Sequence, residues 1–307
     1  MKYAVIDMGS NSIRLMIADV ESGKLGKVEK FLEMTRLGAG VETTKCLCET
    51  SMQATILTVE KFKVQAGEVS ALLLGAFATS AVRDAINGAL FAKRVFEETG
   101  VSVEILQGDE EAELGYKGVV SGLEQTLRSE RFVIVDIGGG STELIVGDMN
   151  HILYRKSFNV GAVRMTGKHI ESDPVVETEA LELQADVVSI LSEGIEALKE
   201  HQPTVAIGIG GTATTFGAMK LSMSVYDRDQ IHNTKVSLET LSKQVNQLKQ
   251  LTLAEKYQLV GLMPKRADVI YSGGVILEHV LSALKLDCFY VSDYDNLEGI
   301  LVQKNII

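Results

Sequence analysis

Two stretches of the sequence decide the fold: VIDMGSNSIRLMIAD (residues 5–19) and IVDIGGGSTELIVGD (residues 134–148). They align without a gap at an offset of 129 residues, so that Asp7 corresponds to Asp136. Each stretch combines an apolar strand, a Gly/Ser turn and an alternating strand, which predicts a β-hairpin. A second pair, LLLGAFAT (residues 72–79) and VAIGIGGT (residues 205–212), follows in the same order at an offset of 133. The repetition predicts two homologous halves.

The pattern between these stretches predicts an α/β fold with two mixed sheets and helices on both faces. We expect a third strand in each half, at residues 27–34 and 152–158, followed by alternating helices and buried strands. The expected domains are residues 1–126 and 127–307, and the last helix is free to pack back on the first domain. Helices are expected at residues 50–66, 88–99, 109–122, 177–199, 238–251, 267–283 and 296–305, and buried strands at 71–74, 102–106, 205–209 and 288–291.

The composition excludes several classes of protein. The 307 residues include 30 Lys and Arg against 41 Asp and Glu, a formal net charge of −11, so we expect no nucleic-acid partner. Three cysteines, an odd number, do not make a disulfide framework. The apolar start is broken by Asp7 and no apolar run is long enough to cross a membrane, so we expect a cytoplasmic protein without a membrane partner.

Four small-residue stretches share one chemistry, at residues 9–12, 138–142, 208–212 and 272–274. Glycines allow the backbone to approach a ligand closely and to point several N–H groups at it, and small hydroxyls add donors without bulk. Any one of these stretches could be only a tight turn. Because two of them are duplicated, the set favours loops that hold phosphate oxygens.

Carboxylates end the strands before the two hairpin turns. Asp7 and Asp136 would repel a phosphate unless they hold a divalent cation that bridges the two. Alternatively, each could accept hydrogen bonds from its own turn. Arg14 has no counterpart in the second half, where Glu143 stands at the matching position, and on an alternating strand Arg14 could be solvated.

Two further segments carry charged residues suited to phosphate chemistry. Arg83 follows the loop of the first half, where a guanidinium could bind a phosphate with two hydrogen bonds or pair with Asp84. The segment GDEEAELGY (residues 108–116) places four carboxylates at a predicted helix start, where the helix dipole alone would favour them. The residues by themselves do not tell which carboxylate is catalytic.

Together these motifs resemble the exopolyphosphatase/guanosine pentaphosphate phosphohydrolase (Ppx/GppA) family in its short, two-domain form. That family belongs to the superfamily of actin, sugar kinases and heat-shock ATPases. The resemblance implies two duplicated ribonuclease-H-like (actin-like ATPase) domains with a cleft between them. The motifs, in family order, are AVIDMGSNSIRL, TRLGAGV, ATSAVRDAIN, ILQGDEEAEL, VIVDIGGGSTEL, GIGGTATT and RADVIYSGG.

The resemblance also implies roles for individual residues. Glu111 is similar to the family base that orients or deprotonates the attacking water, and Arg83 to a ligand of the reacting phosphate. Asp136 and Glu143 resemble the carboxylates that position Mg2+, with Asp7 as a further candidate from the repeat. The implied phosphate-binding residues are Ser10, Asn11, Ser12, Gly139, Gly140, Ser141, Gly210, Gly211, Thr212 and Arg266.

One segment departs from the family pattern. Near the C-terminus the family reads Leu-Arg-Glu-Gly, whereas this sequence has Asn296 and Leu297 before Glu298 and Gly299. The change removes a positive charge, so the resemblance does not carry a phosphate contact over to the last helix. We also expect no contacts from the C-terminal extension of longer members.

The expected activity is release of terminal orthophosphate from inorganic polyphosphate and/or guanosine pentaphosphate, by in-line attack of water with magnesium. A homodimer is compatible with this assignment. Two alternatives use the same loops: a kinase or ATPase of the superfamily, and a non-catalytic sensor of polyphosphate or of guanosine penta/tetraphosphate.

Overall fold

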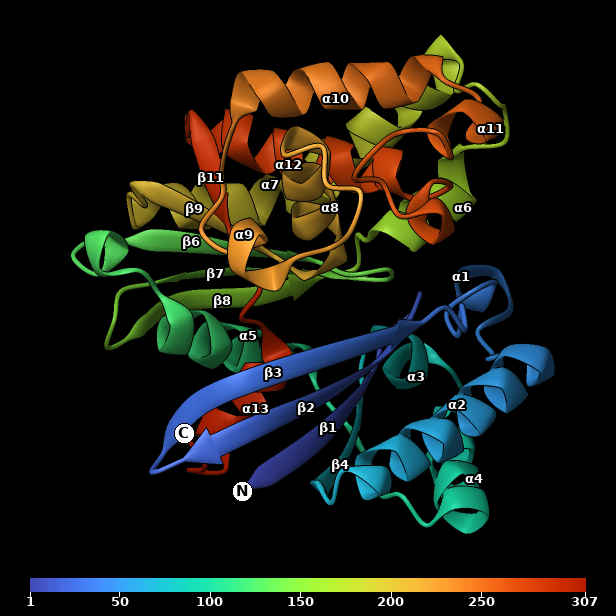
Figure 1. Cartoon of the computed structure of the whole chain (residues 1–307). Coiled ribbons are helices and arrows are strands. Elements are labelled where there is room, and N and C mark those ends of the chain that lie inside the picture. Colours follow the sequence, from blue (N-terminus) through green and yellow to red (C-terminus); the bar gives the residue numbers. More distant parts are fainter. The chain divides into compact units, whose positions relative to one another are not determined.

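The computed structural model describes all 307 residues (Figure 1). The chain forms two compact units: unit 1 is Met1–Gly118 with Asn296–Ile307, and unit 2 is Val119–Asp295. The boundary expected at residue 126 therefore lies inside unit 2. The last helix, which that boundary assigned to the second domain, belongs to unit 1.

The sheet of unit 1 has the strand order β3-β2-β1-β4-β5. The first three strands are antiparallel, because they are consecutive and joined by short turns, whereas β4 and β5 run parallel to β1 after helical crossovers. The strands are β1 (Lys2–Met8), β2 (Ile13–Glu21), β3 (Lys24–Glu33), β4 (Leu72–Ala78) and β5 (Val103–Ile105).

Alternation along β1 buries both faces of this sheet. Ala4, Ile6 and Met8 belong to one core, shared with α2 and α4, which lie side by side in Figure 1. Val5 points to the opposite face, into a second core with Leu297 of α13. The helices are α1 (Val41–Thr44), α2 (Glu49–Glu68), α3 (Ser80–Asp84), α4 (Gly88–Thr99), α5 (Gly108–Gly122) and α13 (Asn296–Gln303); the boundary between the units falls within α5.

The sheet of unit 2 repeats this plan, with the order β10-β11-β9-β6-β7-β8. Its hairpin strands β6, β7 and β8 are antiparallel, β9 and β11 extend the sheet in parallel, and β10 adds an antiparallel edge. The duplicated α/β fold with two mixed sheets is thus confirmed. The strands are β6 (Phe132–Ile137), β7 (Thr142–Gly147), β8 (Ile152–Phe158), β9 (Val205–Ile209), β10 (Lys235–Ser237) and β11 (Cys288–Val291).

One continuous core fills unit 2. Val133 and Val135 of β6 pack with Leu183 of α7 and Ile276 of α12, and α10 lies along α12 (Figure 1). The sequence pattern missed α6, which has only eight residues, and α8, whose Gly- and Thr-rich sequence lacks a clear apolar stripe. The helices are α6 (Ala162–His169), α7 (Glu177–Glu200), α8 (Gly210–Lys220), α9 (Arg228–Ile231), α10 (Leu238–Gln250), α11 (Leu253–Lys256) and α12 (Ile270–Leu284), with 3-10 turns η1 (Gln125–Leu127) and η2 (Pro264–Arg266).

None of the helices combines the length and the apolar character that crossing a bilayer requires. The three cysteines are free thiols: Cys46 and Cys288 are half-buried and Cys48 is exposed.

Candidate active site

The two hairpin turns have the same backbone hydrogen bond. Gly9 N–H donates to the carbonyl of Ser12, and Gly138 N–H donates to that of Ser141, both at 3.0 Å. A Cβ atom on either glycine would lie within 3.3 Å of the same carbonyl oxygen, so a larger residue would crowd the turn. The sequence repeat therefore encodes one turn twice.

In unit 2, strand β9 leads directly into α8 at Gly210. This residue has a φ of 73°, and a Cβ atom on it would lie 2.6 Å from Oδ1 of Asp136. A Cβ atom on Gly211 would lie 1.7 Å from Nη1 of Arg266. The first turn of a helix has N–H groups without partners inside the helix, and these favour anions. The predicted residues Gly210, Gly211, Thr212, Asp136 and Arg266 are thus brought together at the start of α8.

Thr212 contributes mainly to holding this junction together. Its hydroxyl donates to the carbonyl of Ile137 at 3.3 Å and its side chain is buried. Gly273 of α12 packs against it so closely that a Cβ atom there would lie 2.8 Å from Oγ1 of Thr212. The small residues at 272–274 therefore pack under α8 and leave room for its first turn.

Asp136 and Glu143 face each other directly across β6 and β7. Directly paired residues on neighbouring strands point to the same face of a sheet. Both side chains are buried, and Ser157 donates from Oγ to Oε1 of Glu143 at 2.6 Å. Carboxylates that face each other repel, and carboxylate oxygens are ligands that Mg2+ favours, so this pair is suited to a divalent metal ion.

The donor set fits magnesium shared with a substrate. The structure brings together no group of three or more His, Cys, Asp or Glu side chains that could hold a metal. Mg2+ commonly takes one or two carboxylates from the protein and completes its shell with water and substrate phosphates. Asp136 and Glu143 meet that requirement.

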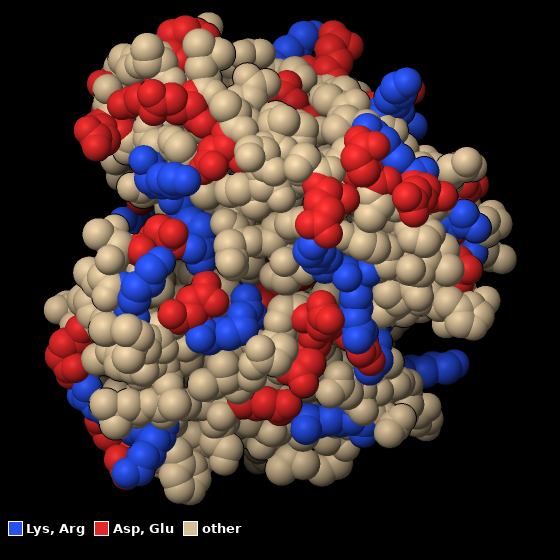
Figure 2. All heavy atoms as spheres, turned by 180° about the vertical axis from the view of Figure 1, so that it is seen from behind, with Lys and Arg blue, Asp and Glu red and all other residues tan.

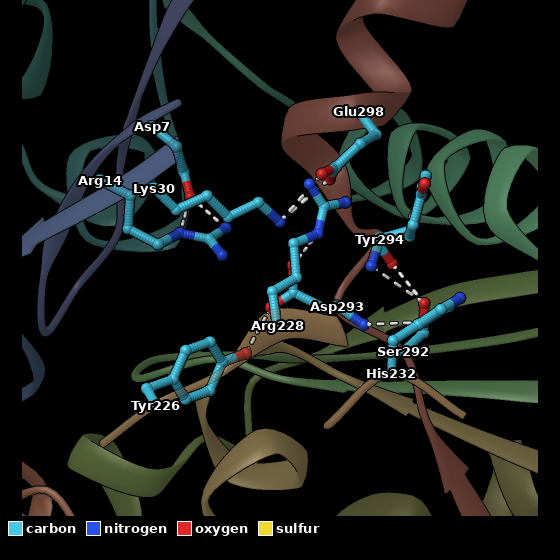
Figure 3. Close-up of polar contacts among 10 residues, drawn as sticks. All are labelled: Asp7, Arg14, Lys30, Tyr226, Arg228, His232, Ser292, Asp293, Tyr294 and Glu298. Carbon is cyan, nitrogen blue, oxygen red and sulfur yellow. Dashed lines mark hydrogen bonds and ion pairs between the residues drawn. The ribbon is translucent and has the colours of Figure 1, made fainter. Parts of the chain in front are cut away.

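The matching pair in unit 1 is an ion pair (Figure 3). Arg14 lies opposite Asp7 in the register of β1 and β2, and it donates from Nε and Nη2 to Oδ2 of Asp7 at 2.9 and 2.6 Å. The Arg14 side chain is only 19% exposed, so it is not the solvated residue that the strand pattern allowed. Since Asp7 is already paired with the Arg14 guanidinium, Asp136 and Glu143 are the better candidates for metal ligands.

Arg83 and Glu111 form the charged centre of unit 1. Nη1 of Arg83 donates to Oε2 of Glu111 at 3.1 Å and to the carbonyl of Leu106, at the end of β5, at 3.0 Å. Asp84, the alternative partner, lies 3.6 Å from Nε of Arg83 and is a more distant contact. The short helix α3 and the start of α5 thus bring the two predicted catalytic residues together.

The structure distinguishes among the acidic residues that begin α5. Glu110 is exposed and accepts a hydrogen bond from the backbone N–H of Gln107 at 2.8 Å, as in an N-terminal helix cap. Glu113 pairs with Lys117 at 2.8 Å on the same helix. Glu111 alone is both buried and in contact with Arg83. The choice of Glu111 thus depends on its burial, which is not evident from the sequence.

Segment 35–38 supports the hairpin turn of unit 1. The N–H groups of Arg36 and Gly38 donate to the carbonyls of Asn11 and Ser10, at 3.0 and 2.8 Å. The hydroxyls of Ser10 and Ser80 lie 2.9 Å apart. The predicted residues Ser10, Asn11 and Ser12 therefore form one supported loop, and Ser80 is a neighbour that the sequence did not single out.

The altered C-terminal segment has a structural role. Leu297 is fully buried in a core of unit 1, and the buried Glu298 pairs with Lys30 at 3.0 Å (Figure 3). In unit 2, Arg228 pairs with Asp293 at 2.8 Å, and Tyr226 also bonds to that carboxylate. The position where the family has an arginine is thus filled by a core side chain.

Comparisons with known proteins identify the family of this chain. A model of the Ppx/GppA phosphatase family matches residues 16–305. The chain is 31% identical to "Exopolyphosphatase 2" of Mycobacterium tuberculosis, over 97% of both chains. It is 33% identical to the "Bifunctional 3-dehydroquinate synthase/phosphatase" of Fusobacterium nucleatum, over 98% of this chain but 46% of that protein, so the chain spans about half of that relative.

Solved structures share the whole fold. An exopolyphosphatase from Cytophaga hutchinsonii superposes with a TM-score of 0.92 at 28% identity, over 100% of this chain and 98% of the other. A Ppx/GppA family member from Aquifex aeolicus superposes with a TM-score of 0.82 at 30% identity, over the same shares. With the family model matching nearly the full length, the chain belongs to the Ppx/GppA phosphatase family.

Proposed function

We propose that this protein is a phosphohydrolase of the exopolyphosphatase type. It releases terminal orthophosphate from inorganic polyphosphate, guanosine pentaphosphate or both, by in-line attack of water. The observation that carries the proposal is the buried Glu111 held 3.1 Å from Nη1 of Arg83 in a chain of this family. The "Exopolyphosphatase 2" relative, matched over 97% of both chains, supports polyphosphate as the first substrate to test.

Glu111 accepts the proton of the attacking water in this proposal. A carboxylate in a buried site can orient a water molecule through one oxygen while the other is held in place. The hydrogen bond from Arg83 to Oε2 fixes the side chain, and the guanidinium places positive charge beside it. Arg83 then also stabilises negative charge on the transferred phosphoryl group.

Each unit has backbone loops suited to binding phosphate. The first-turn N–H groups of α8, the Gly139–Ser141 turn and the Ser10–Ser12 turn supply donors that fit phosphate oxygens without a polybasic surface. Arg266, packed against Gly211, adds a guanidinium at the same helix start. Asp136 and Glu143 would hold Mg2+, which when bound would neutralise charge on phosphate oxygens.

A side-by-side assay tests the proposed function. Phosphate release is measured from short polyphosphate, long polyphosphate, guanosine pentaphosphate and ATP, each with and without Mg2+, for the wild type and for Glu111→Gln. We expect Mg2+-dependent release from polyphosphate or guanosine pentaphosphate, lost in the variant. Binding of these compounds without release by the wild type would instead identify a sensor. Phosphate transfer from ATP to an acceptor would identify a kinase.

A further inference from the structure

The Gly-rich turn of unit 2 is held from one side by the start of α6. The N–H groups of Ala162 and Val163 donate to the carbonyls of Gly138 and Gly139, at 2.9 and 2.8 Å. Gly161 packs so closely below the turn that a Cβ atom there would lie 2.6 Å from backbone atoms of Gly139. The carbonyls of this turn are therefore directed toward α6.

The next carbonyl, that of Gly140, is held by a side chain. Nε of Arg164 donates to it at 2.6 Å. In a trans peptide group, the C=O bond and the following N–H bond point in opposite directions. Since the carbonyls of Gly138, Gly139 and Gly140 are directed toward α6, the N–H groups of the residues that follow each of them, ending with Ser141, are directed away from it. Successive N–H groups aimed the same way form an anion-binding concavity.

In unit 1 the corresponding carbonyl is held by a backbone N–H group and not by a side chain. The repeat equates Asn11 with Gly140, and the Asn11 carbonyl accepts from the backbone N–H of Arg36 at 3.0 Å. The supporting segments match as well: RLGAGV (residues 36–41) and NVGAVR (residues 159–164) align around their first glycines. The Asn11 carbonyl of unit 1 thus has a backbone donor, whereas the matching Gly140 carbonyl of unit 2 depends on the Arg164 side chain.

We propose that Arg164 is a positioning residue of the phosphate cradle: its Nε fixes the Gly140–Ser141 peptide so that the Ser141 N–H faces the substrate phosphate. The inference rests on the proposed function. The competing role is direct binding of phosphate by the guanidinium charge. Positioning depends on the Nε–H donor, and direct binding depends on the positive charge. Substitutions that keep only the donor or only the charge therefore distinguish the two roles.

Three substitutions make that separation. Arg164→Gln keeps an N–H donor at the position of Nε, because Nε2 of Gln is the same number of bonds from the backbone, but it removes the charge. Arg164→Lys keeps the charge and places a methylene where Nε was. Arg164→Met removes both. Lys168→Met, on the exposed side of the same helix where Lys168 pairs with Asp186 at 2.7 Å, is the matched control.

We expect Arg164→Met to lose about tenfold to a hundredfold in kcat/KM for polyphosphate, the range for one charge-assisted hydrogen bond. Arg164→Gln should recover most of that loss, Arg164→Lys should not, and Lys168→Met should match the wild type. Melting temperatures of all variants show whether each is folded. A folded Arg164→Lys that is as active as the wild type, with Arg164→Gln as weak as Arg164→Met, would overturn the positioning role.

A ligand-free measurement keeps the inference independent of the activity. In 15N-labelled protein without substrate, the Ser141 amide shift should move in Arg164→Met and Arg164→Lys and stay near its wild-type value in Arg164→Gln. An unmoved Ser141 shift in Arg164→Met would refute the inference even if the enzyme is active. Absence of phosphate release by the wild type would refute the proposed function and leave this shift test in place.

Discussion

Nη1 of Arg83 bridges two elements of unit 1 by donating to Oε2 of Glu111 at 3.1 Å and to the carbonyl of Leu106 at 3.0 Å. All hydrogen bonds of this guanidinium come from Nη1. Nη2 is therefore the nitrogen suited to meet a phosphate oxygen, while Nη1 holds the carboxylate. In our proposal, the pair links the base Glu111 and the phosphate ligand Arg83 through one rigid group.

The first prediction concerns Glu111. Glu111→Gln keeps the side-chain size and an acceptor for Arg83 but removes the basic oxygen, so kcat should fall about 10²–10⁴-fold, the scale of general base catalysis, with KM little changed. Initial rates of phosphate release measure this. Glu110→Gln, on the exposed neighbour that caps α5, is the control and should keep near wild-type turnover. The reverse ranking of the two variants would assign the base to Glu110.

The second prediction concerns metal. If Asp136 and Glu143 hold Mg2+, excess chelator should abolish turnover. Asp136→Asn should raise the Mg2+ concentration for half-maximal activity about tenfold or more, since even outer-shell partners of metal ligands contribute about 10–100-fold. Asp7→Asn, at the matching position of unit 1, should leave that concentration unchanged because Asp7 is paired with Arg14. Full activity in excess chelator would remove the metal from the mechanism.

The third prediction compares two glycines at α6. Gly161→Ala forces a Cβ atom to within 2.6 Å of the backbone of Gly139, so the turn must shift; we expect a loss of about 1–3 kcal/mol in unfolding free energy and weaker phosphate binding. Gly167→Ala meets nothing within 4 Å and should stabilise the helix by up to about 1 kcal/mol. Denaturant unfolding and phosphate titration measure both. Equal stability of the two variants would contradict the close contact.

The fourth prediction concerns salt. The chain has a net charge of −11, and basic and acidic side chains are interspersed on the face drawn in Figure 2. Backbone N–H groups and a few arginines should dominate binding, so moderate salt should leave polyphosphate affinity unchanged or raise it by screening repulsion. Titrations at several salt concentrations with constant free Mg2+ test this. A steep loss of affinity with salt would show counterion release from a concentrated basic channel instead.

The fold could be predicted well from the sequence because the pattern that forms each hairpin lies within one short stretch. The two hairpins, their turns and the buried strand β9 depend on periodicity and glycines within short stretches, and the structure places them as expected. The helix α8 was missed because its first residues, Gly210 to Thr212, were interpreted as a loop. They are the beginning of a helix whose apolar residues, such as Phe216, become evident only in the packed core.

The candidate site was only partly predictable for a different reason. No local pattern distinguishes among the carboxylates of α5, since the choice depends on burial and on Arg83, which is 28 residues away along the chain from Glu111. Arg164 was missed because its role depends on one backbone carbonyl of another segment. Long-range contacts of this kind leave no periodic signal.

The pairing of Asp7 with Arg14 has a consequence for regulation. The duplicated hairpins differ in charge only at this cross-strand position, where unit 1 has an arginine and unit 2 has a second carboxylate. In our proposal the charge of Asp7 in the first turn is always balanced by Arg14, which belongs to the chain itself. If Asp136 and Glu143 hold Mg2+ as proposed, the charge balance of the second turn depends on a divalent ion taken from solution. Unit 2 would then respond to the supply of divalent ions, whereas the charge balance of the Asp7–Arg14 pair would not.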